Sequence, residues 1–410
     1  MKKVGVIGAG PAGMTAAIAA AGKGAEVILF EQKERVGQKI LATGNGKCNL
    51  ANTNLSVDFY HGMHHEFAEK ILDRFPLQDT IAFFSQIGIY TKNRNGGLYP
   101  NSEQASAVLD CLRMELRRRQ IKVRTDSKII GVRLLSPAGF IIKEKSGREE
   151  KFDRIILAAG SKAAPKTGSD GSGYKIAKGL GIHIIKPLPA LTQLKSEDGW
   201  FKGVSGVRCD AQLTLCIDGK AEARERGELQ IVDYGLSGIP AFQLSGRAAR
   251  AIDRKCRVEI KIHFLPEFDG MQDPSYLTEF LWKRFDQMEK TCEEALTGLF
   301  HKKLTAFFLR ASGIRTQEAA KDLTKEQLNR LISVITNCSV TVNAVNSYEH
   351  AQTCTGGIDT EELDSNLQVK KIPGFYVAGE IIDIDGACGG YNLQWAWATG
   401  QIAGACAAND

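Results

Sequence analysis

Glycines near the N-terminus recur at a spacing that suits the binding of a phosphate group. Together with the two residues between them they form the motif Gly8, Gly10, Pro11, Ala12 and Gly13. An apolar segment over 4–7 precedes the motif and an alanine-rich segment over 14–21 follows it, which predicts a strand, a turn and a helix. In such a unit the glycines allow a tight turn and the close approach of a pyrophosphate, which the start of the helix attracts. The motif therefore predicts a dinucleotide site.

A carboxylate lies where such a site would bind a ribose. Glu31 directly follows a second apolar segment over 26–30, which predicts the next strand. An acid at that point can accept hydrogen bonds from the adenosine ribose, and it disfavours a 2′-phosphate. We assign Gln32 and Lys33, which come next, to the same site.

A second loop rich in glycine, small polar residues and cations distinguishes FAD from NAD. Its candidate cofactor residues are Lys39, Thr43, Gly44, Asn45, Gly46, Cys48 and Asn49. A nicotinamide dehydrogenase does not need this loop, whereas FAD binds in an extended form and requires more donors along its pyrophosphate and ribityl chain. The loop therefore favours FAD. We expect the FAD to be bound without a covalent link, because we interpret Cys354 and Cys388 as small neutral packing residues, although a thiol near N5 or a covalent link is the alternative.

Two further clusters, in the middle and near the end of the chain, support FAD. The first is the end of an apolar strand expected over 155–160, and we add Ile129 to the same site. In the second, Glu380 is suited to a ribityl hydroxyl, and a helix expected from 389–392 to about 408 would direct its positive end at the N1/C2=O edge of a flavin. The candidates are Ala158, Ala159, Gly160, Gly379, Glu380, Asp385, Gly390, Tyr391, Asn392 and Leu393.

Length and composition predict a globular protein of two or three domains. The chain has 410 residues, of which 43% are hydrophobic and 24% charged, which argues against disorder and against a polytopic membrane protein. The uncharged stretch over 4–22 imitates a signal peptide, but its glycines and Pro11 disfavour that interpretation. The net charge of +6 is mild, so a nucleic-acid partner is not indicated.

Cysteines and histidines show no pattern that is typical of a metal site. The ten cysteines contain no C-x-x-C pair, which argues against structural zinc and a vicinal disulfide and fits a reducing cytoplasm. We expect surface roles for His61, His64 and His65, and we predict no metal. The basic runs over 113–124 and 247–257 are interpreted as solvated helix faces. The oligomeric state stays open.

Patterns along the chain predict an α/β protein whose cofactor domain is interrupted by an insertion. Residues 192–262 alternate short apolar segments with turns, the spacing from Pro274 to about 336 is helical, and residues 340–345 return to the pattern of a strand. We therefore expect an FAD-binding Rossmann-type fold from 1–191 and 340–410, with an inserted substrate domain that is β-rich over 192–262 and helical over 263–339. The substrate candidates, at a turn before a helix, are Asp233, Tyr234 and Ser237.

Across its whole length the sequence resembles the bacterial FAD flavoproteins described as aminoacetone-oxidase-like or bile-acid-reductase-like oxidoreductases. The resemblance rests on the segments 37–40, 43–49, 168–174, 189–191, 235–238 and 389–397. It implies a two-dinucleotide-binding-domain fold built from both ends of the chain. Departures are Lys47 for an expected arginine, Cys354 for an expected threonine, and Val232 and Asp233 for a common Thr-His pair.

The motifs and the resemblance predict an FAD-dependent oxidoreductase. Hydride would pass through flavin N5 between a donor, with NAD(P)H or a small organic compound as candidates, and an organic acceptor or oxygen. The chain shows no second glycine-rich strand–turn–helix motif, so NAD(P)H would visit the substrate cleft transiently. No residue stands out as an acid or base. Alternatives are a flavin-binding sensor or scaffold and an FAD-dependent RNA-modifying protein.

Overall fold

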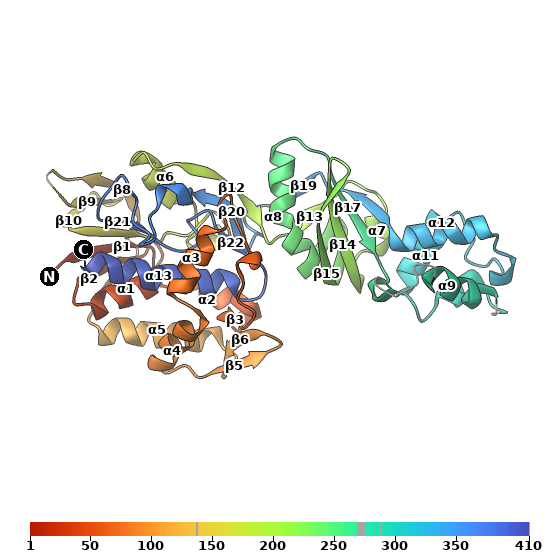
Figure 1. The fold of residues 1–410 in the computed structure, drawn as a ribbon, viewed down its shortest axis with the longest axis horizontal. Coiled ribbons are helices and arrows are strands. Elements are labelled where there is room, and N and C mark those ends of the chain that lie inside the picture. Colours follow the sequence, from red (N-terminus) through yellow and green to blue (C-terminus); the bar gives the residue numbers. More distant parts are fainter. Residues whose placement is uncertain (137, 269–275, 287–288, 410) are drawn as a thin grey trace. The chain divides into compact units, whose positions relative to one another are not determined.

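The computed structural model describes residues 1–136, 138–268, 276–286 and 289–409, and its chain forms two compact units. The first unit consists of Met1–Pro189 and Tyr348–Asp410, and the second of Ala190–Ser347. The two ends of the chain, red and blue in Figure 1, therefore build one unit together.

A parallel sheet forms the centre of the first unit. In spatial order its strands are β21 (Phe375–Val377), β11 (Arg154–Leu157), β1 (Lys3–Ile7), β2 (Glu26–Phe30) and β7 (Lys122–Arg124). The central strands are almost wholly buried, as expected for a parallel sheet covered on both faces. Because β1 lies between β2 and β11, the loops that follow these three strands meet at one edge of the sheet.

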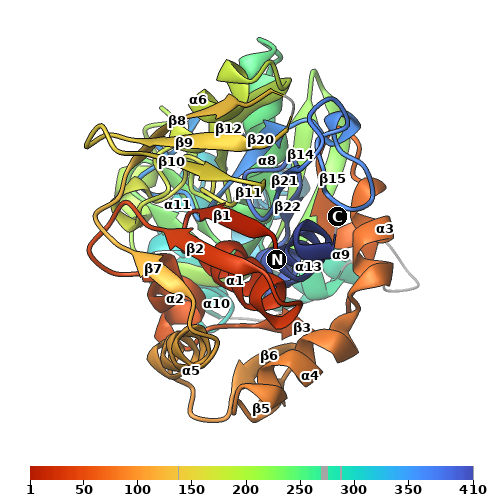
Figure 2. The same cartoon turned by 90° about the vertical axis from the view of Figure 1, so that its left-hand side faces the viewer.

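Two apolar helices pack closely against each other beside this sheet, as Figures 1 and 2 both show: α1 (Pro11–Gly22) and α13 (Tyr391–Asn409). A Cβ atom at Gly400 would lie 2.5 Å from the carbonyl oxygen of Ala12, and one at Gly404 would lie 2.2 Å from that of Ala16. Glycine is therefore needed at both positions. This contact ties the start of the chain to its end.

Smaller elements complete the first unit. The short sheets are β10–β9–β8 (Glu149–Phe152, Phe140–Glu144, Ile129–Leu134), β3–β6–β5 (Ala51–Asn52, Gly97–Pro100, Thr91–Arg94), β22–β4 (Asp385–Gly386, Tyr60–His61) and β12–β20 (Ile184–Ala190, Thr353–Ile358). The helices are α2 (Gln38–Ala42), α3 (Phe67–Arg74), α4 (Leu77–Gln86), α5 (Ala105–Arg118) and α6 (Ser172–Gly179).

An antiparallel sheet forms the core of the second unit. Its order is β18 (Cys338–Thr341), β17 (Val258–His263), β14 (Arg208–Ile217), β15 (Lys220–Val232), β16 (Gly235–Gly238), β13 (Leu194–Lys195) and β19 (Ala344–Val345). Alternate residues of β14 and β17 are buried, which is the period of a sheet with one covered face. The helices are α7 (Phe201–Val204), α8 (Ile239–Asp253), α9 (Tyr276–Asp286), α10 (Cys292–Leu296), α11 (Lys302–Ala311) and α12 (Lys325–Thr336).

The second boundary between the units differs from the sequence-based expectation. The strand expected over 340–345 was assigned to the returning cofactor domain, but β18 pairs with β17 and β19 pairs with β13, so both belong to the second unit. The chain returns to the first unit only at Tyr348. Pro274, where the helical pattern begins, lies outside the described residues. Within the described part of the chain, no helix combines the length and the hydropathy that crossing a bilayer requires.

Candidate cofactor site

The three glycines of the first turn differ in the space available for a side chain. A Cβ atom at Gly8, whose φ is +101°, would lie 2.4 Å from the carbonyl oxygen of Ala158, and one at Gly13 would lie 1.8 Å from that of Gly8. A Cβ at Gly10 would meet no atom within 4 Å, and no side chain caps the start of α1 there. Packing therefore requires the first and third glycines, whereas the second leaves an open surface where the N–H groups of α1 can face a phosphate.

Glu31 lies beside this turn with its carboxylate held by backbone donors. The amide of Ala9 donates to Oε2 at 3.1 Å and the amide of Lys33 donates to Oε1 at 2.9 Å. Burial raises the pKa of Glu31, although these hydrogen bonds act in the opposite direction. The side-chain amide of Gln32 donates to the carbonyl oxygen of Gly168, which brings the 168–174 segment to the same place. Lys33 contributes its backbone amide to this arrangement.

The second predicted loop leads from an exposed turn to a buried amide. Gly44 and Asn45 adopt left-handed φ angles of 55° and 53° in the turn Thr43–Gly46. The thiol of Cys48 is buried, and burial raises its pKa to about 12. Asn49 Oδ1 is buried and has no hydrogen-bond partner among the described residues. A Cβ at Gly390 would lie 2.9 Å from this oxygen, so the loop meets the segment that begins α13.

Glu380 connects three predicted clusters. Its Oε2 lies 2.5 Å from Lys39 Nζ, and its Oε1 accepts a hydrogen bond of 2.5 Å from Ser161 Oγ. A Cβ at Gly379 would lie 2.7 Å from the Cβ of Ala12, which places this segment against the start of α1. The structure thus brings Lys39 and Glu380 together. Sequence reasoning missed Ser161, which directly follows the predicted Gly160 but carries no recognisable spacing signal.

Side chains at the start of α13 have protein partners. Asn392 accepts a hydrogen bond from the amide of Gly386 at 2.9 Å and donates to its carbonyl oxygen at 2.7 Å. The hydroxyl of Tyr391 donates to the carbonyl oxygen of Asn54. These contacts fix the segment on which Gly390 has a φ of +103°. The predicted cofactor role of Asn392 and Tyr391 would therefore be mainly to hold the backbone in place.

Of the other predicted residues, Ala158 and Gly160 directly follow β11 at the same edge of the sheet. Ala158 donates its amide to the carbonyl oxygen of Ile7 at 2.8 Å, and a Cβ at Gly160 would lie 2.6 Å from Ser169 Oγ. Ile129 is buried at the start of β8, two residues after Ser127, whose amide donates to the carbonyl oxygen of Glu31. The remaining candidates, next to these segments or in α13, are Ala159, Asp385 and Leu393.

Cys354 lies in this region as a neutral thiol. Burial is the main cause that raises its pKa to about 11, and the nearby carboxylate of Glu380 adds to the effect. A thiol with this pKa stays protonated at neutral pH and is a poor nucleophile. The nearby hydroxyl of Tyr174 is buried without a hydrogen-bond partner among the described residues.

The three substrate candidates lie in the second unit, and they differ in exposure to solvent. Asp233 and Tyr234 form the exposed turn between β15 and β16, and Lys195 Nζ lies 5.9 Å from the centre of the Tyr234 ring. Ser237 is instead buried within β16. The helix expected after Gly238 is α8.

The first unit contains the features that FAD requires. The open surface at Gly10 and the free start of α1 suit a pyrophosphate, and Glu31 can accept hydrogen bonds from a ribose through its remaining lone pairs. The unpartnered Asn49 Oδ1 can accept a further hydrogen bond. Glu380 adds a carboxylate from the other end of the chain, so groups from both ends are available to an extended cofactor.

Comparisons with known proteins find relatives over almost the whole chain. The model of the HI0933-like protein Rossmann domain family matches residues 2–406. The chain is 42% identical to the 3-dehydro-bile acid delta(4,6)-reductase of Clostridium scindens, over 100% of this chain and 99% of that protein. It is 27% identical to the ribosomal RNA dihydrouridine synthase of Escherichia coli, over 98% of this chain and 96% of that protein.

A solved structure shows the same kind of fold. The 3-ketosteroid delta1-dehydrogenase of Sterolibacterium denitrificans has a TM-score of 0.51 at 11% identity, over 100% of both chains. The predicted α/β fold with a Rossmann-type cofactor domain and an insertion is confirmed, and so is the predicted FAD-dependent oxidoreductase. The chain belongs to the HI0933-like family of proteins with a Rossmann domain.

Proposed function

We propose that this oxidoreductase reduces a carbon–carbon double bond conjugated to a carbonyl group, in a steroid-like 3-ketone. The observation that carries the proposal is the 42% identity along the full chain to a reductase named for a 3-dehydro-bile acid. The more distant relatives are named for making dihydrouridine, which also requires saturation of a double bond conjugated to a carbonyl. A shared reaction type would explain how related sites act on such different molecules.

The residues of the first unit would hold and tune the cofactor. Once a donor has reduced it, bound FAD would supply a hydride from N5 of its ring. The start of α1 would bind the pyrophosphate through its N–H groups, and Glu31 would accept hydrogen bonds from the ribose hydroxyls. Glu380, held by Lys39 and Ser161, would orient the ribityl chain. The start of α13 would direct partial positive charge at the flavin.

The second unit would bind the substrate. Asp233 and Tyr234 are candidates because their turn is exposed and immediately precedes β16 and α8, and we retain Ser237 as a candidate from the same segment. NAD(P)H is our candidate for the donor that reduces the cofactor. Because the sequence has no second dinucleotide motif, NAD(P)H would enter and leave the same cavity as the substrate.

RNA is the second candidate substrate. The 27% identity to the ribosomal RNA dihydrouridine synthase extends over 98% of this chain, so it is not limited to the cofactor residues. Arg247 and Arg254 of the α8 region are exposed, together with Lys255 and Arg257, which gives the second unit a basic surface suited to phosphates. The higher identity to the bile acid reductase favours the small ketone.

Reoxidation of the reduced holoprotein under anaerobic conditions tests the proposal. The flavin is photoreduced and mixed with a 3-oxo-4,6-diene bile acid, and its absorbance is followed while the product is identified by mass spectrometry. We expect reoxidation with the gain of hydrogen at a double bond. A fully saturated 3-oxo bile acid is the matched control and should leave the flavin reduced.

A parallel mixture with unmodified ribosomal RNA distinguishes the second candidate. Reoxidation by RNA alone, with formation of dihydrouridine, would replace the ketone with RNA as the substrate. Reoxidation by neither compound would contradict the proposed reaction. Anaerobic reduction of the oxidised flavin by NADH and by NADPH, compared at equal concentration, tests the donor in the same apparatus.

A further inference from the structure

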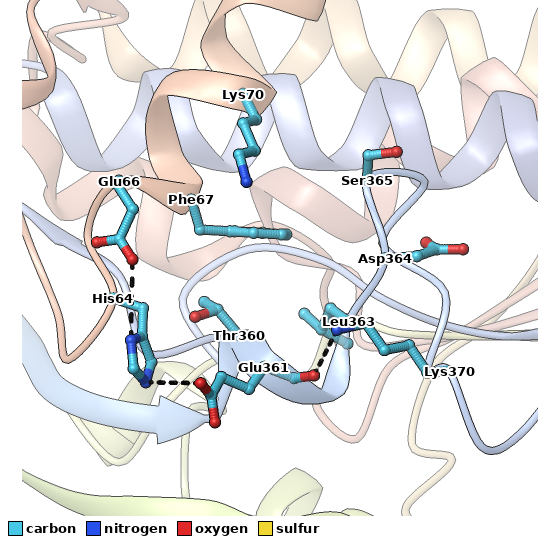
Figure 3. Close-up of a pocket in the computed structure, with 10 residues that line it drawn as sticks. All are labelled: His64, Glu66, Phe67, Lys70, Thr360, Glu361, Leu363, Asp364, Ser365 and Lys370. Atoms are coloured by element: carbon cyan, nitrogen blue, oxygen red, sulfur yellow. Dashed lines mark hydrogen bonds and ion pairs between the residues drawn. The ribbon is translucent and has the colours of Figure 1, made fainter.

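A histidine and two carboxylates converge at the edge of a pocket that the cofactor residues do not use. Donor atoms of His64, Asp359 and Glu361 all lie within 4.8 Å of one another. Figure 3 shows the imidazole of His64 between Glu66 and Glu361, and its Nε2 lies 3.6 Å from Glu361 Oε1. In the sequence the whole second unit lies between His64 and the two acids, so a search for ligand spacing could not find the group.

The backbone that carries His64 is fixed by its neighbours. It follows β4 and precedes α3, and the amide of the preceding Met63 donates to Asp383 Oδ2 at 2.8 Å. The carbonyl oxygen of His64 accepts a hydrogen bond of 3.1 Å from the amide of Phe67. A side chain on such a segment loses little conformational entropy when it binds a ligand.

Asp359 is the buried member of the group and is hydrogen-bonded to a second histidine, His183, whose own side chain is largely exposed. Only 10% of the Asp359 side chain is exposed, and its Oδ2 lies 2.9 Å from Nδ1 of His183. Its Oδ1 accepts a hydrogen bond of 2.9 Å from the amide of Glu361. A histidine behind a carboxylate, with both held by the backbone, resembles the outer contacts that orient metal ligands in proteins. Each oxygen of Asp359 retains a lone pair for a further partner.

We propose that His64, Asp359 and Glu361 bind a divalent transition-metal ion of the zinc type. In a tetrahedral zinc site the donor atoms lie about 3.4 Å apart, given bonds of about 2.0 to 2.1 Å. The present separation of His64 and Glu361 is close to that value, and 71% of the Glu361 side chain is exposed and can adjust. An imidazole nitrogen favours zinc over calcium or magnesium, which prefer oxygen ligands.

The adjoining pocket gives the ion an open side. The pocket has a volume of about 340 Å³ and is lined by His64 and Glu361 at one side, with Phe67 and Leu363 among its apolar residues (Figure 3). Lys370, which also lines it, donates to the backbone carbonyl oxygen of Glu361 at 2.8 Å. Three protein ligands leave a fourth position for water or for an anionic ligand that enters the pocket.

Zinc binding to the flavin-loaded holoprotein tests the proposal against the simpler arrangement, in which a protonated His64 only forms ion pairs with Glu66 and Glu361. The holoprotein is dialysed against buffered zinc chloride, and bound zinc is measured by elemental analysis over a range of free zinc concentrations. The test variants are His64→Ala and Glu361→Gln. His65→Ala is the matched control, because it removes a neighbouring exposed histidine that does not belong to the group.

We expect the wild type and His65→Ala to hold one zinc ion per chain more than His64→Ala. Glu361→Gln should weaken this site, and His183→Ala should reduce its affinity about 10- to 100-fold without changing the number of ions at saturation. An unchanged flavin spectrum and circular dichroism show that each variant is folded. Equal zinc in wild type and His64→Ala, or an equal loss in His65→Ala, would overturn the proposal.

Discussion

Glu31 and Glu380 are both partly or fully buried carboxylates of the cofactor site, but their partners differ. Backbone amides hold Glu31, and the charge of Lys33 also favours its ionised form, although the two side chains form no ion pair in the described part of the chain. Glu380 forms an ion pair with Lys39 and accepts from Ser161. Replacing Glu31 should therefore affect mainly binding, whereas replacing Glu380 should also change the charge balance near the redox ring.

Glu31→Gln should weaken FAD binding by about 1 to 3 kcal/mol, since a hydrogen bond to a charged acceptor is replaced by a neutral one. This corresponds to an increase in the dissociation constant of FAD of about 5- to 150-fold. Titration of apoprotein with FAD, followed by flavin fluorescence, measures it. Glu26→Gln is the control. Glu26 is exposed at the start of β2, the strand that Glu31 follows, and the variant should bind FAD as the wild type does.

The affinity for FAD should also decrease as the pH is lowered, and this decrease should depend on Glu31. Burial raises the pKa of this carboxyl, so protonation begins at a higher pH than for an exposed glutamate. The ionised form accepts the ribose hydrogen bonds, so affinity is present above the raised pKa and is lost as pH falls through it. FAD titrations at successive pH values should show this loss in the wild type. A Glu31→Gln variant with the same pH dependence would contradict the assignment.

Substitutions of Glu380 and Lys39 should shift the flavin potential in opposite directions. Glu380→Gln removes a negative charge and should raise the midpoint potential, because reduction adds negative charge to the ring, while Lys39→Gln should lower it. A shift of about 30 mV corresponds to about 1.4 kcal/mol for a two-electron couple. Spectroelectrochemistry measures the potentials. Glu31→Gln should leave the potential unchanged, and equal potentials in all variants would refute our placement of Glu380.

At the scale of elements, local sequence patterns predicted the strand that precedes Glu31 and the helix that follows the first glycines. The strand over 26–30 is β2 with the same limits, and the helix expected after the glycine motif is α1. These elements depend on apolar runs and turn glycines that are neighbours in sequence. The last helix, α13, also begins at its predicted glycines. The assigned residues that follow β1, β2 and β11 lie at one edge of the sheet, and their roles in binding the cofactor stay predictions.

Contacts between distant segments could not be predicted from the sequence. Lys39 in α2 pairs with Glu380, which follows β21, and His64 after β4 meets the two acids after β20. These segments are far apart in the chain, and no local pattern records their contact. The strand over 340–345 was recognised as a strand, but its hydrogen-bond partners decide which unit it joins. Alternation identifies a strand, whereas its sheet is a non-local property.

Glycine-to-alanine substitutions at two positions of the first turn should have different effects. Gly13→Ala should lower the melting temperature of the apoprotein, because its Cβ would clash with the backbone at Gly8. Gly10→Ala should leave it nearly unchanged, since its φ is −79° and no protein atom is close, but should weaken FAD binding by crowding the pyrophosphate. Calorimetry of the apoprotein and FAD titration measure the two effects. Normal FAD binding by Gly10→Ala would show that the cofactor does not pass there.

At the scale of the whole molecule, the division into two units suggests a division of tasks. The residues assigned to the cofactor come from both ends of the chain, and all of them belong to the first unit. The second unit has its own apolar core. A unit with a separate core can vary without disturbing the cofactor. Substrate choice should therefore reside in the second unit.

Asp233→Asn should change turnover more than FAD affinity, because the residue is exposed on the second unit and the substitution removes charge with little change in volume. The rate of anaerobic flavin reoxidation by the dienone and the dissociation constant of FAD are compared with those of the wild type. Glu222→Gln, another exposed acid of this unit, is the control. Loss of flavin with normal turnover of the remaining holoprotein would move Asp233 to the cofactor site.

The identity and amount of the cofactor released from the purified protein test the central claim most directly. The protein is denatured by heat, and the released compound is separated by chromatography and quantified against the protein concentration. We expect intact FAD at up to one molecule per chain, released completely because it is bound without a covalent link. The buried thiol of Cys354, whose pKa burial raises to about 11, is a poor nucleophile. Release of FMN, release of NAD alone, or a flavin that stays attached to the denatured peptide would contradict the account.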